Sequence, residues 1–187
     1  MRSATGSPNA AVRTVLLLCA ASAIAAGKSR PLVKFGLLDA AFGATSNLVA
    51  RSDNPPAVLH MSFLELGAGV RSGDHPGFAV GTALLEGDVM DYLSLLPLRG
   101  WLMYDIDPGR TLRSAMVYLS AAYDWCIQDG WSGNQLDPGF RFAGGMSYTF
   151  YAVTPHAELG YDVRQRRATL TAGLALGGTY VFRQRGG

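Results

Sequence analysis

Apolar and small polar residues alternate along most of the chain after Lys34. The alternation is clearest over 168–182, where bulky apolar residues such as Leu170 and Leu174 occupy one parity and Thr, Gly and Ala occupy the other. A period of two is typical of β-strands with two different faces, because successive side chains point to opposite sides. The same split recurs in seven further segments: 37–45, 64–71, 78–86, 97–106, 113–125, 139–151 and 156–164. The pattern predicts eight strands, and no helical period competes with it.

The links between these segments alternate in length. Compact, turn-like links lie at 72–77, 107–110 and 153–155, whereas longer links lie at 46–57, 87–96 and 126–137; the last, around Gln165, is short. An even number of strands with short turns at one side and longer loops at the other is typical of membrane barrels. We therefore predict an all-β fold, an eight-stranded antiparallel up-and-down transmembrane β-barrel over 34–182, with both termini on the short-turn side.

Two orientations of such a barrel fit the alternation. A secreted barrel of the lipocalin kind has an apolar interior and a polar exterior rich in long charged side chains. Here only 16% of residues are charged, only Lys28 and Lys34 are lysines, and the polar face consists mostly of Gly, Ala, Ser and Thr. Small residues suit the inside of a narrow eight-stranded barrel, and lipid covers an apolar exterior. The membrane orientation is therefore favoured over the lipocalin-like one.

The first 25 residues have the features of a secretory signal peptide. Arg2 and Arg13 supply a positive region, 15–21 begins a short apolar stretch, and 23–25 supplies the small residues that signal peptidase accepts. Cleavage leaves a periplasmic segment over 26–33 and equal numbers of basic and acidic residues, so nucleic acid is not an expected partner. Cys126 is the one cysteine left, so no intrachain disulfide is expected.

The architecture, the signal peptide and the final strand together resemble a known family. The last strand, 174–182, ends in the aromatic residues Tyr180 and Phe182. Over 34–182 the chain is similar to the small outer-membrane barrels of Gram-negative bacteria, the OmpA/OmpX type. The resemblance implies a location in the cell outer membrane, contact with outer-membrane lipid and lipopolysaccharide, and a C-terminal signal at Tyr180 and Phe182 for the barrel-assembly machinery. The tail 183–187 departs from the family, whose members usually stop at the final aromatic residue.

If the small face lines the lumen, ten charged residues point inward. They are Asp39, Glu65, Arg71, Arg99, Asp105, Asp124, Arg141, Glu158, Asp162 and Arg164. A charge in a poorly hydrated lumen is costly unless it is paired. We predict a network that plugs the lumen, formed by Asp39, Glu65, Arg99, Arg141 and Glu158; if Glu158 and Arg141 are partners, their substitutions are non-additive. A small gated channel is the alternative.

One constellation bears on catalysis. His60 and Ser62 share parity, and Ser62 is expected opposite Glu86 on the next strand; Ser, His and an acid can attack an acyl ester. The tripeptide His60-Met61-Ser62 is similar to the H-x-S motif of outer-membrane lipid A deacylases. Since Leu59, Met61 and Phe63 are the apolar set there, a β-bulge would turn His60 and Ser62 from the lipid to the lumen. Which side they face is left open.

The sequence as a whole predicts a non-enzymatic outer-membrane barrel with a structural, envelope-integrity or surface-interaction role. A lipid-modifying enzyme that uses Ser62, His60 and Glu86 is the alternative. No metal-ligand spacing and no cofactor motif is present, so neither a metal nor a cofactor is expected, and the residues do not identify a surface ligand.

Overall fold

The computed structural model describes residues 29–47, 57–74, 76–89, 91–107 and 113–181. The predicted signal peptide 1–25, Phe182 and the tail 183–187 lie outside the described residues. The strands are β1 (Ser29–Asn47), β2 (Ala57–Ser72), β3 (Pro76–Asp88), β4 (Tyr92–Leu95), β5 (Leu98–Asp105), β6 (Arg113–Asp124), β7 (Cys126–Asp129), β8 (Gln135–Leu136), β9 (Gly139–Phe150), β10 (Val153–Asp162) and β11 (Arg167–Val181). No helix in these ranges is long and apolar enough to cross a membrane.

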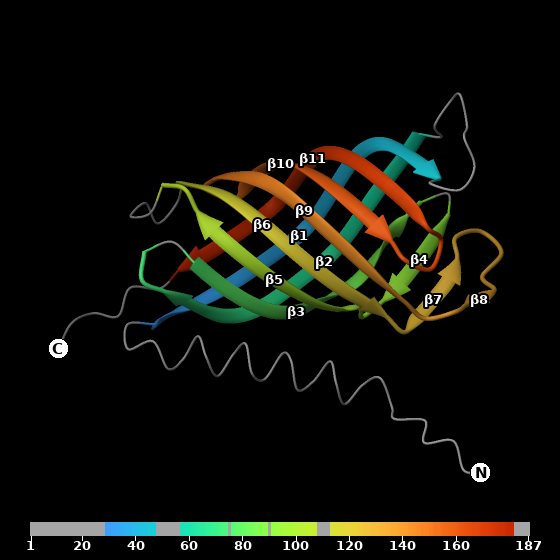
Figure 1. Ribbon diagram of the computed structural model, residues 1–187, viewed down its shortest axis with the longest axis horizontal. Coiled ribbons are helices and arrows are strands. Elements are labelled where there is room, and N and C mark those ends of the chain that lie inside the picture. The colour runs from blue at the N-terminus through green and yellow to red at the C-terminus, as the bar shows by residue number, and fades with distance from the viewer. Residues whose placement is uncertain (1–28, 48–56, 75, 90, 108–112, 182–187) are drawn as a thin grey trace, which may run out of the picture.

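Eight of these strands close into a barrel (Figure 1). The order is β2-β1-β11-β10-β9-β6-β5-β3, and pairing of β2 with β3 completes the circle. Every neighbouring pair is antiparallel. The predicted eight-stranded up-and-down barrel is thus confirmed. Its first strand begins at Ser29, so residues 29–33, assigned above to a periplasmic segment, are part of β1.

Three short strands extend the sheet beyond the barrel at the long-loop end (Figure 1). β4 pairs with β3 on one side and with β7 on the other, and β7 also pairs with β8. These strands lie inside segments that the sequence analysis assigned to the loops 87–96 and 126–137. The long links therefore contain short strands that the sequence did not predict, because runs of two to four residues are too short to show a period.

Bulky apolar side chains lie on the outside of the barrel wall. Phe42, Leu119, Met146, Leu159 and Leu170 are each more than half exposed. Buried positions on the inward face carry small or polar residues instead, together with a cluster of Leu32, Ala79, Trp101, Met103 and Met116 in the short-turn half of the lumen. The wall therefore has the orientation that the membrane interpretation requires, apolar outward and mostly small or charged inward.

A line of irregularities crosses the first strands and changes which residues face inward. In β2, Ser62 and Glu65 are both buried although they are three residues apart, and so are Ala83 and Glu86 in β3. Leu64, between the first two, has a φ of 51°, a conformation that a leucine rarely adopts. The β1–β11 register also shifts between Gly36 and Leu38. One extra residue per strand reverses the inward parity, as β-bulges do.

Candidate functional site

A buried carboxylate in the lumen joins two arginines from different strands of the wall. Glu86 of β3 is fully buried. Its Oε1 accepts hydrogen bonds from Arg99 of β5 and from Arg141 of β9, the latter with an Nη1–Oε1 distance of 3.0 Å. Arg141 also clamps Asp124 of β6 with two bonds, Nε–Oδ2 at 2.6 Å and Nη2–Oδ1 at 2.9 Å. Such bidentate arginine–carboxylate pairs are among the strongest polar contacts in proteins.

The same chain of contacts continues to both sides of the lumen. Glu65 of β2 accepts from Lys34 of β1 and pairs with Arg99, with 3.4 Å between Nη1 and Oε1. At the other end Ser94 Oγ donates to Asp124 Oδ1 at 3.0 Å, and Arg141 Nη1 lies 2.6 Å from the Tyr92 hydroxyl. The contacts therefore run without a break from β1 to β6 across the interior. We call Lys34, Glu65, Arg99, Glu86, Arg141 and Asp124 the central network.

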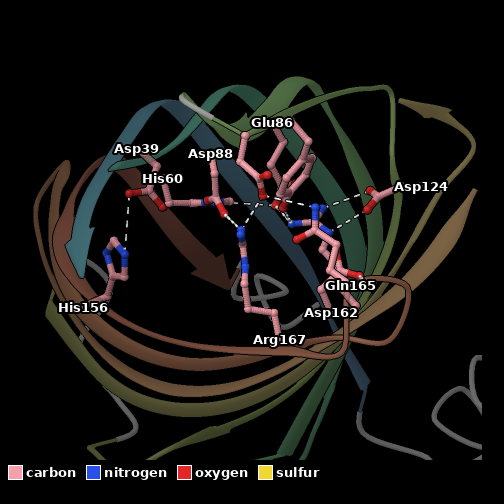
Figure 2. Close-up of polar contacts among 12 residues, drawn as sticks. Asp39, His60, Glu86, Asp88, Asp124, His156, Asp162, Gln165 and Arg167 are labelled. Atoms are coloured by element: carbon pink, nitrogen blue, oxygen red, sulfur yellow. Dashed lines mark hydrogen bonds and ion pairs between the residues drawn. The ribbon is translucent and has the colours of Figure 1, made fainter. Parts of the chain in front are cut away.

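A second group of charges lies beside the central network toward the long-loop end (Figure 2). Asp88 of β3 accepts from His60 Nδ1 at 2.9 Å and from Arg167 Nη2 at 3.2 Å. Arg167 also pairs with Asp91, to which Gln165 Nε2 donates at 3.1 Å. His60 connects this group to the central network, because its Nε2 lies 3.4 Å from Glu86 Oε1. One imidazole is thus held between two buried carboxylates.

The five residues of the predicted network are divided by the structure. Glu65, Arg99 and Arg141 belong to the central network, linked through Glu86. Asp39 instead faces His156, with 3.5 Å between Oδ1 and Nε2 (Figure 2), and Glu158 accepts a 2.9 Å hydrogen bond from the Tyr118 hydroxyl. In the described part of the chain, no hydrogen bond or ion pair joins Glu158 to Arg141, the pair whose partnership the sequence analysis considered. Further inward charges pair separately, Arg71 with Asp105 at 3.0 Å and Arg164 with Asp162 at 3.1 Å.

Sequence reasoning missed three members of the central network. Asp124 was expected to point inward but was not placed in the network, Glu86 was considered only for catalysis, and Lys34 was given no role. Alternation alone places Asp124 inward, since β6 keeps one parity from Ser114 to Asp124. Lys34 and Glu86 lie beyond the parity changes in β1 and β3, so no simple alternation could assign them.

The residues of the catalytic alternative lie in the lumen, which answers the orientation question left open above. Ser62 is directly opposite Glu86 in the β2–β3 register, as expected, and Ser62 is only 5% exposed. However, Ser62 Oγ has no hydrogen-bond partner among the described residues, while the His60 ring nitrogens face Asp88 and Glu86. A nucleophilic serine needs its base within hydrogen-bond reach, and this arrangement gives Ser62 none.

The described residues enclose two cavities in the lumen, with volumes of about 80 Å3 and 50 Å3. The first, lined partly by Trp101 and Met103, lies toward the short turns, and the second, lined by Tyr92 and Arg167, lies toward the long loops. Four residues line both: His60, Arg99, Glu158 and Thr171. We call these four the partition. Within the described ranges no cluster of three or more His, Cys, Asp or Glu residues could hold a metal ion.

The predicted assembly signal is only partly described. Tyr180 lies near the end of β11, and its hydroxyl donates to the Tyr151 carbonyl at 3.2 Å. This bond ties the last strand to the β9–β10 turn at the short-turn end. Whether Tyr180 and Phe182 direct assembly stays a prediction.

Comparison with known proteins finds similarity at the level of structure. No family model and no curated protein sequence matches the chain. The crystal structure of neisserial surface protein A (NspA) is similar with a TM-score of 0.51 and 13% identity, covering 83% of this chain and 99% of that one. The structure of Ail, the attachment invasion locus protein of Yersinia pestis, in complex with the heparin analogue sucrose octasulfate, gives 0.35 and 10%, covering 81% and 99%. The chain thus has the fold of the small eight-stranded outer-membrane β-barrels, as the sequence resemblance implied.

Proposed function

We propose that this protein is an outer-membrane barrel of Gram-negative bacteria that has a structural, envelope-integrity or surface-interaction role, and that its lumen is closed by charged residues. The observation that carries this proposal is the fully buried Glu86 of β3, bonded to Arg99 of the neighbouring strand β5 and to Arg141 of β9. Opening a path through the centre requires separating these groups, and an unpaired charge in such surroundings is strongly unfavourable.

The apolar outer wall supports the membrane part of this proposal. Exposed leucine, phenylalanine and methionine side chains surround the barrel, which would be unfavourable in water over so large an area. In a bilayer the closed sheet satisfies its own backbone groups, and acyl chains cover the apolar side chains. We accordingly expect outer-membrane lipid and lipopolysaccharide as neighbours, and the barrel-assembly machinery as the partner that inserts the chain.

A surface role is proposed for the long-loop end. There β4, β7 and β8 extend the sheet beyond the end of the barrel (Figure 1). In outer-membrane barrels the longer loops are extracellular. NspA, which has the same fold, is by its name a surface protein.

A closed lumen predicts that the folded protein conducts no ions. We expect purified protein, inserted into planar lipid bilayers, to give no discrete conductance steps, because an ion that passes between the two cavities has to displace the partition, in which Arg99 is ion-paired with Glu65 and Glu86. Heat-modifiable gel mobility of the same sample tests whether the barrel is folded, and a porin added afterwards shows that the bilayer detects channels. Stable steps from the folded protein would support the small-channel alternative instead.

We also propose that the protein is not an enzyme and requires no cofactor. Support comes from the missing contact between Ser62 and His60. The acylation pattern of lipid A, measured by mass spectrometry, should be the same in cells that express wild-type protein, the Ser62→Ala variant or no protein. Ser62→Ala should also leave the stability of the barrel close to that of wild type, since the Ser62 hydroxyl has no hydrogen-bond partner among the described residues. Loss of one acyl chain only with wild-type protein would establish the deacylase alternative.

A further inference from the structure

The outer wall is hollowed near the short turns. A groove of about 380 Å3 runs from the end of β5 across β6 and β9 to β10, and the side chains along it are almost all apolar. Those on the outward parity are Ile106, Ala115, Val117, Met146, Tyr148, Pro155 and Ala157. The two alanines are the smallest of these: Ala115 lies opposite Tyr148 of β9, and Ala157 lies opposite Met146 of β9 and Ala172 of β11. The groove is therefore a depression in the wall, formed where these alanines stand beside larger side chains.

The strand ladder is interrupted beside this depression. The pairing of β9 with β10 passes from Val153↔Phe150 to His156↔Ser147, without pairs at Thr154 and Pro155. Proline has no N–H to donate to a ladder, so it weakens pairing where it occurs in a sheet. The sheet is therefore irregular where Pro155 lines the groove.

A positive charge stands at the short-turn end of the groove. Arg113 begins β6 and shares its outward parity with Ala115 and Val117. In the β6–β9 register, Arg113 faces Phe150, and the next two outward pairs, Ala115–Tyr148 and Val117–Met146, line the groove. The Arg113 guanidinium carbon lies 4.8 Å from the centre of the Phe150 ring. The guanidinium is thus held over an aromatic ring directly in line with the groove.

Arg113 is available for an anionic partner. Among the described residues no carboxylate forms an ion pair with it, and the adjoining segment 108–112 contains no acidic residue. Its side chain is exposed. Since short turns of outer-membrane barrels face the periplasm, this end of the wall meets the periplasmic leaflet, where an arginine at the interface attracts anionic headgroups.

From this geometry we infer a binding site for one anionic phospholipid, with an acyl chain in the groove and the headgroup phosphate on Arg113. The inference rests on the proposed membrane location. The apolar walls exclude water and contact the chain, while the guanidinium donates charge-assisted hydrogen bonds to phosphate oxygens. The site combines an apolar depression with a cation aligned to it.

Native mass spectrometry of the detergent-purified full barrel tests this site. The protein is equilibrated with phosphatidylglycerol or phosphatidylcholine of identical chains, and retained lipid is counted. We expect one tightly retained phosphatidylglycerol per barrel and weaker retention of phosphatidylcholine. Arg113→Gln should reduce phosphatidylglycerol retention about fivefold, as expected for one basic group at a membrane surface. Ala115→Phe, which fills the groove, should reduce retention of both lipids.

Matched controls lie elsewhere on the same surface. Arg166→Gln removes an exposed arginine at the opposite end of the barrel, and Ala121→Phe enlarges an outward alanine of β6 beyond the groove; both should retain lipid like wild type. Equal retention of phosphatidylglycerol by wild type, Arg113→Gln and Ala115→Phe would overturn the site. A dimer that carries no lipid would also overturn it, because a second copy of the chain would then cover the groove. If the sample lacks heat-modifiable mobility, the proposed membrane barrel itself is wrong. If the barrel is folded but retains phosphatidylglycerol no better than phosphatidylcholine, only the lipid-site inference is wrong.

Discussion

Replacing Glu86 by glutamine is expected to destabilise the folded barrel by about 3–5 kcal/mol, the usual range for removing one partner of a buried ion pair. Glu86 is fully buried and accepts from Arg99 and Arg141. After substitution Arg99 retains Glu65 and Arg141 retains Asp124, but the charge between the two arginines is gone. Urea unfolding in lipid vesicles, followed by tryptophan fluorescence and by gel mobility, measures the change in free energy.

A double-mutant cycle tests whether Glu86 and Arg141 act as a pair. Arg141→Gln alone should also be strongly destabilising, because Asp124 loses its two charge-assisted bonds from Arg141 and keeps the one from Ser94. The double variant should be less destabilised than the sum of the two by about 0.5–3 kcal/mol, since contacting residues are coupled. As a control, Asp74→Asn disrupts the exposed 3.8 Å pair with Arg30 and should change stability by at most about 1 kcal/mol. A small, additive effect of Glu86→Gln would contradict the central network.

The parts of the fold that could be predicted are those in which the strand period is unbroken. The strands β6, β9, β10 and β11 keep one inward parity along their length, and alternation alone located them to within a few residues. The first strands were placed too short: the alternation was recognised from 37 and from 64, whereas β1 begins at Ser29 and β2 at Ala57. Leu37 and Leu64 are the irregular positions themselves. When the inward-facing positions change from even to odd numbers within a strand, a search for one continuous alternation finds only the part of the strand after the change.

The candidate site was partly hidden for the same reason. The sequence shows that Glu86 and Ser62 lie opposite each other, because register follows from the turn between their strands. It does not show that both point inward, because the backbone conformation of Leu64 has no signature in the side chain of a leucine. The partners of Glu158 and Asp39 depend on strand tilt across the lumen, which brings Tyr118 and His156 close. Pair identities in a barrel interior require the three-dimensional register of all the strands, which local alternation cannot supply.

Replacing Leu174 by arginine should destabilise the barrel in lipid by about 2–4 kcal/mol, the cost of a charge on the lipid-facing wall at the bilayer midplane. Leu174 is the middle residue of β11 and its side chain is 57% exposed, so a cation placed there meets acyl chains rather than protein. The matched change Val163→Arg lies just past the long-loop end of β10, at a residue that is 44% exposed, where the bilayer interface makes the same charge cost about 0–1 kcal/mol. Urea unfolding in vesicles measures both variants. A depth-dependent difference is what an acyl environment produces, because water solvates an arginine equally well at either position. Equal stability of wild type, Leu174→Arg and Val163→Arg would mean that water surrounds the wall, and the outer-membrane location would be wrong.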